Sequence, residues 1–218
     1  VIREEWRTRR SPEFRMDNQV RPIIYKGSKY AIRDVIGDIN VINNFKHQEI
    51  KDYYAKWYRP DLQSIIIIGD IDVDQVEAKI KTLFADIAKP VNPATREFFE
   101  LPDNDQPIIG IASDPEASNT TLNIYYKHDA TPKDAKNIGY LRDKMIQDLI
   151  SSMLSSRLSE ITQKPNPPYV FAISTMTDMV RTKSAFMFFA ALKNDAMLDG
   201  VKGVVREAER VKRFGFTA

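Results

Sequence analysis

The sequence predicts an α+β chain in two parts, and three observations support this fold class. Between residues 47 and 87, an amphipathic helical pattern, a continuous apolar run and a second amphipathic pattern follow one another, which is typical of layered α/β packing. After residue 106, two pairs of strand-like segments are each followed by a helical pattern. The stretch 89–107 holds four prolines among polar residues, so it is the best place for a linker between the two parts.

The start of the chain favours helix and then irregular structure. Residues 1–10 are mostly good helix formers. Ser11 is a suitable helix cap and Pro12 suits a first helical turn, so a second helix or a kink is expected there. Pro22 and the glycine-containing sequence after it are expected to end this region, and residues 30–44 are expected to be irregular.

The clearest elements follow. The sequence HQEIKDYYAKWY, residues 47–58, places apolar side chains at i, i+3, i+4 and i+7, which predicts an amphipathic helix that stops before Pro60. The run IIIIG at 65–69 predicts a buried strand. After the sequence GDIDVD, a second helix is predicted from apolar residues that share one face. These residues are Val76, Ile80, Leu83, Phe84 and Ile87.

The second part is predicted to contain strand, strand, helix, strand, strand and helix in that order. The first long helix is expected from about Lys133 to Gln163, because the Lys-Pro-Asn-Pro-Pro run after it cannot continue a helix. The last helix is expected from Ala196 to about Arg213. The predicted strands are 107–113, 119–127, 169–176 and 184–192.

Composition excludes several classes of protein. Hydrophobic residues make up 43% and charged residues 28% of the 218-residue chain, a balance that argues against disorder. The net charge of +2 gives no strong attraction to nucleic acid or to anionic membranes. With no cysteine, the chain cannot form disulfides or thiolate metal sites. Its longest apolar runs are too short to span a bilayer, and no signal segment is evident. Both ends look cut, because VIREEW begins without a helix cap and ERVKRFGFTA stops just after a helix, so we expect an excised part of a longer protein.

Two histidines limit the metal chemistry that this chain can supply. Neither His47, at a helix start, nor His128, at a strand end, has another histidine at ligand spacing, so no complete zinc site can be assembled from a local motif. We expect His47 to contribute to a helix start and His128 to be exposed at a strand end. A nucleophile-elbow serine, a phosphate-cradling loop and a dinucleotide fingerprint are all absent from the sequence.

The basic opening of the chain has two interpretations. Residues 1–33 hold nine Lys or Arg against four Asp or Glu, and Arg3, Arg7 and Arg10 fall along one ridge, a pattern that suits phosphate neutralisation. Glutamates interrupt this stripe, and Glu5 with Arg9 has the spacing of a surface ion pair. We therefore predict no nucleic-acid partner, and taken alone Glu5 is a solvated helix residue.

One long string carries a family resemblance. The segment KWYRPDLQSIIIIGDIDVDQVEAKIKTLF, residues 56–84, resembles part of a domain of the pitrilysin/insulinase-type zinc metallopeptidases, the inverzincins. The residues that match the family's pattern are Tyr58, Pro60, Gly69, Asp70 and Phe84. The segments VIREEWR, YKGSKYAIRDVIG and ERVKRFGFT are similar to further family segments in the expected order, so the resemblance covers nearly the whole chain.

The resemblance implies a metal ligand in this chain. In that family a His-x-x-Glu-His helix supplies two zinc-binding histidines and the general base, and a later glutamate in a stretch resembling V-I-x-x-E is the third protein ligand. Here that glutamate matches Glu5, whereas Glu4 points about 100° away on a helix. The sequence has no His-x-x-Glu-His, so we assign no catalytic residue to it and no substrate-binding residue can be named. Zinc is expected in the intact parent, and this chain alone is expected to be inactive and free of zinc.

The resemblance also implies domains and partners. The expected domains are two-layer α/β sandwiches of the zinc-peptidase type, with antiparallel-rich mixed sheets and helices on one face. Residues 1–92 would end the active-site domain, 93–106 would link, and 107–218 would begin the following domain. The parent would be a zinc endopeptidase that encloses peptide or unfolded protein between two peptidase-like halves or subunits. The alternative is a non-catalytic homologue that acts as a structural or partner-binding half. The sequence leaves the compartment open, and an extracytoplasmic one, periplasmic or secreted, is compatible with this family.

Overall fold

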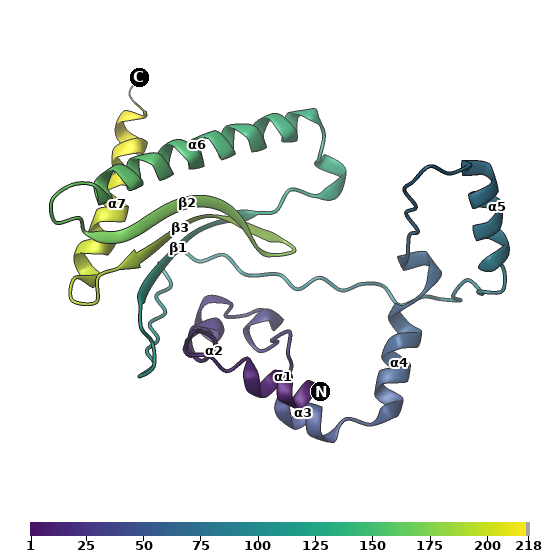
Figure 1. The fold of residues 1–218 in the computed structure, drawn as a ribbon. Helices are drawn as coiled ribbons and strands as arrows, with labels where there is room; N and C mark the ends of the chain where they lie inside the picture. Colours follow the sequence, from purple (N-terminus) through teal and green to yellow (C-terminus); the bar gives the residue numbers. More distant parts are fainter. Residues whose placement is uncertain (217–218) are drawn as a thin grey trace. The chain divides into compact units, whose positions relative to one another are not determined.

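The computed structural model describes residues 1–216, and contacts within the chain divide it into two units. The larger unit joins Val1–Ile36 to the residues from Phe98 onward, and the smaller unit is Gly37–Glu97. Figure 1 shows the elements of both units along the chain. The domains expected from the sequence, 1–92 and 107–218, concern the longer parent protein and stay a prediction.

Within the described residues, the larger unit contains four short helices or helical turns, a three-stranded sheet and two longer helices. Its elements are α1 (Ile2–Thr8), α2 (Pro12–Ile24), the 3-10 turn η1 (Lys29–Ala31), β1 (Thr120–Asp129), the 3-10 turn η3 (Lys133–Ala135), α6 (Ile138–Thr162), β2 (Tyr169–Val180), β3 (Lys183–Leu192) and α7 (Met197–Phe214). The smaller unit contains α3 (Ile39–Asn44), α4 (His47–Trp57), the 3-10 turn η2 (Pro60–Leu62) and α5 (Val73–Leu83).

The sheet of the larger unit is antiparallel, with the strand order β1-β3-β2 (Figure 1). On the central strand, Phe188 lies opposite Ile124 of β1 and Ser174 of β2. Because side chains alternate along a strand, these three residues share one face of the sheet. Both long helices, α6 and α7, pack on that face, which confirms the predicted two-layer α+β architecture with helices on one side.

The core lies between this face and the two helices. Phe188 on β3 is 2% exposed, and Leu158 on α6 and Val204 on α7 are fully buried. Partly buried apolar side chains from β1 and the last turns of the helices surround this cluster. The core residues are Leu154, Leu158, Tyr169, Ala172, Phe188, Ala190, Leu192 and Val204.

Serine residues set the contact between α6 and the edge strand β2. Ser155 on α6 accepts a hydrogen bond from the Ser174 backbone N–H at 2.9 Å, and Ser174 donates its own hydroxyl to the Ser151 carbonyl at 3.0 Å. An edge strand has backbone groups without a ladder partner, and the helix satisfies one of them here. The small serine side chains also allow the helix to approach the strand closely.

Only the second half of α6 takes part in this packing. Its buried residues are Ser151, Leu154 and Leu158, all beyond the middle of the helix. The first half exposes apolar side chains in the described structure, among them Leu141 at 55% and Leu149 at 60%. A helix that is apolar outside its packed face has further apolar surface available for burial.

Two charged residues are buried in the larger unit with partners. Glu207 on α7 is 4% exposed and accepts hydrogen bonds from Arg157 on α6 at 2.9 Å and from Arg210 at 3.1 Å. Lys183, at the start of β3, lies between Asp103 and Asp129, and these carboxylates raise the pKa of its ammonium group. In both arrangements, side chains of opposite charge compensate the buried ion, as the burial of a charge requires.

The segment 107–113 does not form the strand that the sequence predicts. It lies along α2 instead: Gln19 donates a hydrogen bond to the Ser113 carbonyl at 3.2 Å, and a Cβ placed on Gly110 would come 2.9 Å from the Val20 side chain. The segment therefore contacts a helix at Gly110 and Ser113, and no strand of the described residues pairs with it. An apolar run alone cannot distinguish these two environments.

An ion pair fixes the end of this segment to α2. Arg15 donates to both carboxylate oxygens of Asp114, each at 2.6 Å, and also contacts Glu116. The hydrogen bonds from Arg15 lower the pKa of Asp114 from its ordinary value of 3.8 to about 2. Because the ionised form is the one that is held, the pair stabilises the fold at neutral pH.

Asp114→Asn is expected to lower the melting temperature of the full chain at pH 6 and to have almost no effect near pH 2. Asparagine keeps the oxygen that accepts the Glu116 backbone N–H at 3.0 Å but lacks the charge that binds Arg15. The lowered pKa of Asp114 stabilises the folded state fully above pH 3.8, the ordinary pKa of this carboxyl group. This stabilisation is lost as the pH falls through about 2, the pKa in the folded state. Melting curves of both proteins between pH 6 and pH 2 measure this difference, and a difference that is constant with pH would contradict the prediction.

The smaller unit differs most from the prediction. Its two main helices, α4 and α5, lie where the sequence patterns place them. The predicted buried strand at 65–69 is wrong: these residues have no regular structure, and Ile66 and Ile68 are 81% and 92% exposed. No strand occurs among residues 37–97, so the apolar run has no sheet to join and the layered packing expected there is not formed in this unit.

A short helix also replaces the irregular structure expected for 30–44. Asp38 accepts hydrogen bonds from the backbone N–H groups of Asn40 and Val41 and thereby caps α3. Aspartate is a favoured N-cap residue, because its side chain satisfies amides that lack a helical partner. At the other predicted helix start, Ser11 caps α2 with Pro12 in the first turn, as expected.

Candidate functional site

The predicted zinc ligand, Glu5, lies on the exposed helix α1. Its carboxylate forms an ion pair with Arg9 at 2.6 Å, and 45% of its side chain is exposed. The neighbouring Glu4 pairs with Arg7 at 2.8 Å and is more exposed, at 68%. The i, i+4 pair expected between Glu5 and Arg9 is thus present, and surface pairs of this kind contribute little to stability.

Two arginines of the basic stripe predicted at the start of the chain make separate local contacts. Arg7 is paired with Glu4, and the Arg10 guanidinium lies 4.6 Å from the centre of the Trp6 ring, in a cation–π arrangement. These arginines are engaged locally on α1 and in the residues just after it. The arrangement favours an ordinary charged helix surface over a phosphate-binding ridge.

Neither histidine lies near other metal ligands. His47 is exposed at the first position of α4, and His128 is exposed in β1, where its Nδ1 lies 3.0 Å from the Asp129 carbonyl oxygen. The predicted positions are confirmed: His47 begins α4, and His128 is exposed near the end of β1. Within residues 1–216, no group of three His, Cys, Asp or Glu side chains could hold a metal ion.

The donors in this chain therefore do not fit a zinc centre by themselves. Zinc in proteins takes three or four nitrogen, sulfur or oxygen ligands in tetrahedral geometry. Glu5 offers one carboxylate, whose described partner is an arginine. We derive no chemical step through zinc from these residues.

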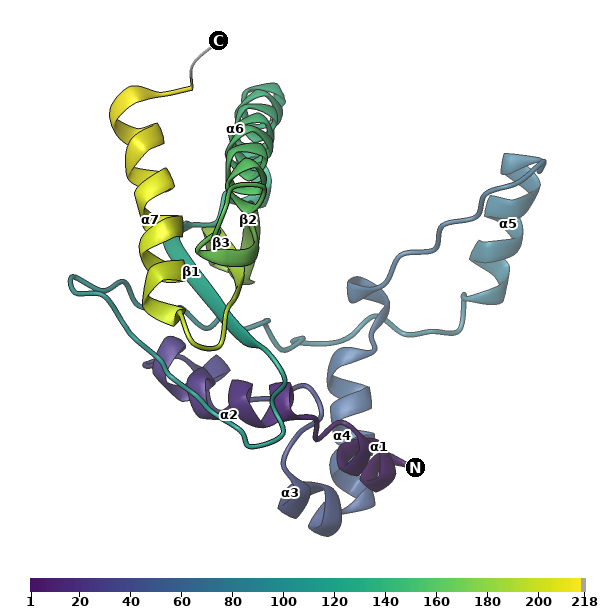
Figure 2. The same cartoon turned by 60° about the vertical axis from the view of Figure 1, so that its left-hand side comes forward.

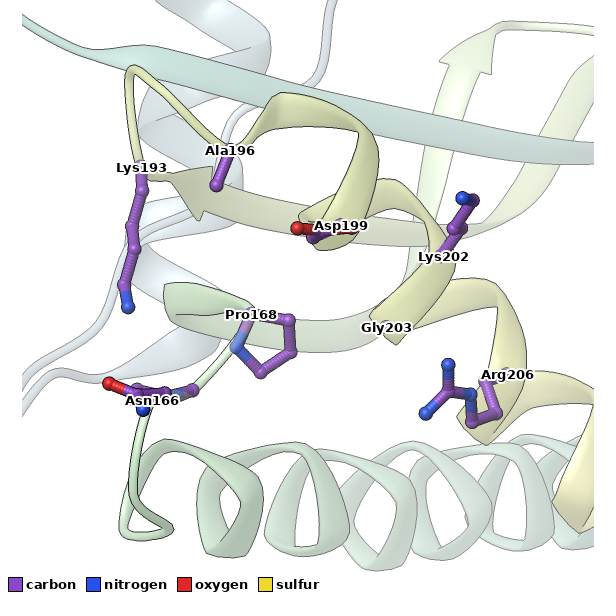
Figure 3. A pocket seen from close by; sticks show the side chains of 9 residues that line it. Asn166, Pro168, Lys193, Ala196, Asp199, Lys202, Gly203 and Arg206 are labelled. Carbon is purple, nitrogen blue, oxygen red and sulfur yellow. The ribbon is translucent and has the colours of Figure 1, made fainter.

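The structure also contains a basic pocket beside α7 that the sequence did not predict. Residues of α7 and of the loops before β2 and α7 line a pocket of about 410 Å³, which carries Lys193, Lys202 and Arg206 (Figure 3). In the sequence, these residues form no known motif. The available signal was the spacing of Lys202 and Arg206, which puts two like charges one turn apart on a helix.

Solved structures with this fold are proteases. The first half of the periplasmic protease PqqL from Escherichia coli matches 100% of this chain and 46% of that chain with a TM-score of 0.83, at 19% identity, which shows the fold. The ferredoxin protease FusC, solved in complex with Arabidopsis ferredoxin, matches 98% of this chain and 23% of that chain with a TM-score of 0.77 and 25% identity. The fold of this chain is thus the one found in these protease structures.

The family follows from the sequence match. Residues 44–218 match the family of the peptidase M16 inactive domain, and the chain belongs to this family. The predicted peptidase family is confirmed. A probable zinc protease, PqqL, of Haemophilus influenzae is 34% identical over 163 residues, which are 73% of this chain and 17% of that protein. The chain thus spans about a fifth of the length of such relatives, and Glu5 lies outside the range that the family match covers.

No helix among the described residues is both long and apolar enough to cross a membrane.

Proposed function

We propose that this chain is a non-catalytic part of a zinc endopeptidase that cleaves peptides inside an enclosed chamber. The observation that carries the proposal is the match of residues 44–218 to the inactive domain of this peptidase family, together with a relative of 34% identity described as a probable zinc protease. The role of the chain would be to form chamber wall, to support the active-site domain and to supply one carboxylate.

The smaller unit supports a role as the end of an active-site domain. Four consecutive isoleucines, Ile65 to Ile68, are each about half exposed or more, although the sequence pattern is that of a buried strand. Such a segment gains most by joining a sheet, since its backbone groups and its side chains are then covered together. In the proposed parent, residues 1–92 complete the active-site domain and 93–106 lead into the next one.

The proposed substrate is an unfolded protein or peptide held between two peptidase-like halves. Two observations on related proteins support this. FusC was captured with a protein, ferredoxin, and the matching part of the Escherichia coli protease is described as its first half. In this chain, the exposed apolar half of α6 is a surface that a second half could cover. The proposal extends to an extracytoplasmic location, because that protease is described as periplasmic.

Glu5→Gln in the natural polypeptide that carries this chain is expected to weaken zinc binding by at least about 100-fold. Glutamine keeps the size of the side chain but replaces an anionic oxygen ligand with a neutral amide. Changes to residues that merely support a ligand already cost about 10- to 100-fold in metal affinity, so loss of a ligand should cost at least as much. Competition with a zinc chelator of known affinity measures the change.

Glu4→Gln is the matched control, because Glu4 is the adjacent glutamate on the same helix and has an arginine partner of its own. It should leave zinc affinity and peptide cleavage unchanged. If Glu5→Gln retains full zinc affinity, or if both substitutions lower it equally, Glu5 is not the ligand. Because zinc affinity is measured directly, this outcome would leave the peptidase activity itself as a separate question.

A non-catalytic homologue is the second candidate function. It is favoured by the family's description as an inactive domain and by the lack of a metal-binding group among residues 1–216. In this case the natural polypeptide would form a structural or partner-binding half of a peptidase complex. The gene sequence before Val1 separates the two functions: a His-x-x-Glu-His motif there supports the peptidase, whereas a coding sequence without it supports the non-catalytic half.

A further inference from the structure

The pocket on α7 is built from three segments of the larger unit. One wall is the turn before β2, with Asn166 and two prolines; the other is α7, and Lys193 lies in the loop that joins β3 to this helix. Figure 3 shows Lys193 and Arg206 on either side of Pro168. The lining residues are Asn166, Pro167, Pro168, Lys193, Ala196, Asp199, Lys202, Gly203 and Arg206.

A glycine makes the close approach of the two walls possible. A Cβ placed on Gly203 would lie 2.7 Å from Cγ of Pro168 and 3.3 Å from Cε1 of Tyr169, closer than packed carbon atoms come. Tyr169 in turn is fully buried, and its hydroxyl donates to the Leu158 carbonyl at 3.0 Å. Core contacts thus hold the proline wall against the helix, and this makes that wall of the pocket rigid.

The lining is positively charged, with three cations and one carboxylate. Lys193, Lys202 and Arg206 outnumber the single carboxylate, Asp199, by two charges. Within the described residues, none of these three cations forms a salt bridge, whereas Arg210 and Arg213 further along α7 are paired with glutamates. Like charges one turn apart on a helix repel each other, so Lys202 and Arg206 have an arrangement that an anion would relieve.

We propose that this pocket binds a small, multiply charged anion, an oligophosphate or a polycarboxylate. Arginine offers a planar set of donors that binds two oxygens of one anionic group, and lysine adds point charges that any anionic oxygen can meet. With one cation from the loop and two from the helix, the pocket can contact more than one anionic group of a ligand at once. This ligand class follows from charge and donor type and does not depend on the peptidase activity.

The test uses tripolyphosphate and citrate as probes on the natural polypeptide that carries this chain. Isothermal titration at low ionic strength should show saturable binding of at least one probe, and added salt should weaken it because the lining is partly exposed. The double substitution Lys202→Met with Arg206→Met should lower the affinity by about tenfold or more, since it removes two charge-assisted contacts. Preference for tripolyphosphate or for citrate distinguishes an oligophosphate from a polycarboxylate.

Arg142→Met is the matched control, because Arg142 is an exposed arginine on α6 that does not line the pocket. It should leave the affinity unchanged. Without ligand, the double variant should melt at the same temperature as the original protein or higher, because it loses a like-charge pair. Should it fail to fold, Lys193→Met, in the loop before α7, provides the same measurement. If neither probe binds at low salt, or if the pocket variants bind as tightly as the Arg142→Met control, the proposal is wrong.

Discussion

Leu158→Ala is expected to destabilise the larger unit by about 3–5 kcal/mol. Leu158 is fully buried in the second half of α6, among core residues of the sheet and of α7. Truncation removes most of an apolar side chain from the core and leaves a cavity, because the surrounding sheet and helix can relax only partly. The backbone carbonyl that accepts the Tyr169 hydroxyl remains, so the loss reflects packing rather than this hydrogen bond.

Native-state hydrogen exchange of the β3 amides is the most direct measurement, because it reports the opening of this unit separately from the smaller one. The matched control is Leu149→Ala, the same change two and a half turns earlier on α6, where the side chain is 60% exposed. It should change the free energy of opening by no more than about 0.5 kcal/mol. Equal effects of the two substitutions would show that the described core is not where the stability of this unit resides.

Glu207→Gln is expected to cost about 2–3 kcal/mol. The Glu207 carboxylate is almost completely buried and joins two arginines, Arg157 on α6 and Arg210 on α7. Glutamine has nearly the same shape but no charge, so the Arg157 guanidinium, whose side chain is 23% exposed, loses its described charge partner. The cost is therefore mainly that of a poorly compensated charge inside the fold rather than of lost packing.

Glu209→Gln, two residues later, provides the comparison. Glu209 pairs with Arg213 at 3.2 Å on the exposed side of α7, and such pairs contribute between zero and about 1 kcal/mol. Urea unfolding of both variants of the full chain, followed by circular dichroism, should show a clear loss for position 207 and little change for position 209. A large loss at both positions would point to the helix as a whole rather than to the buried charge.

Elements with strong local signals were predictable from their own residues. The helix at 47–57 and the helix after Asp72 follow from the spacing of apolar side chains and from the stop signals beside them. The strand pair of β2 and β3 also lies where its apolar residues indicated, and a two-residue turn joins them. For β2 and β3, the local pattern and the tertiary environment agree. The helices α4 and α5 form where local signals place them, although neither contains a buried residue.

The two strand predictions that were wrong share a physical cause. Residues 65–69 and 107–113 have the apolar character of strands, but a strand exists only when a neighbour supplies the other half of its hydrogen bonds. The first has no such neighbour among residues 37–97, and the second contacts α2 in place of a strand. The periodicity of a sequence shows which face of a segment can be buried, but it does not show which other element will cover that face.

The candidate functional residues also could not be identified from their local sequence pattern alone. Glu5 was identified through the resemblance of its segment to a peptidase family, since its own surroundings are those of a surface ion pair. The pocket on α7 could not have been found in this way. Lys193 is separated from Arg206 by a loop and several helical turns, and only the folded chain brings both to the same cavity.

The four isoleucines at 65–68 also have a consequence for handling the protein. A short, uncharged, β-branched run without regular structure is a template for intermolecular β-pairing, and its side chains are exposed here. Asp70 stands just after the run, where like charges of neighbouring copies repel and oppose stacking. Pairing between copies depends on their concentration, so purification of the chain should keep the protein concentration low.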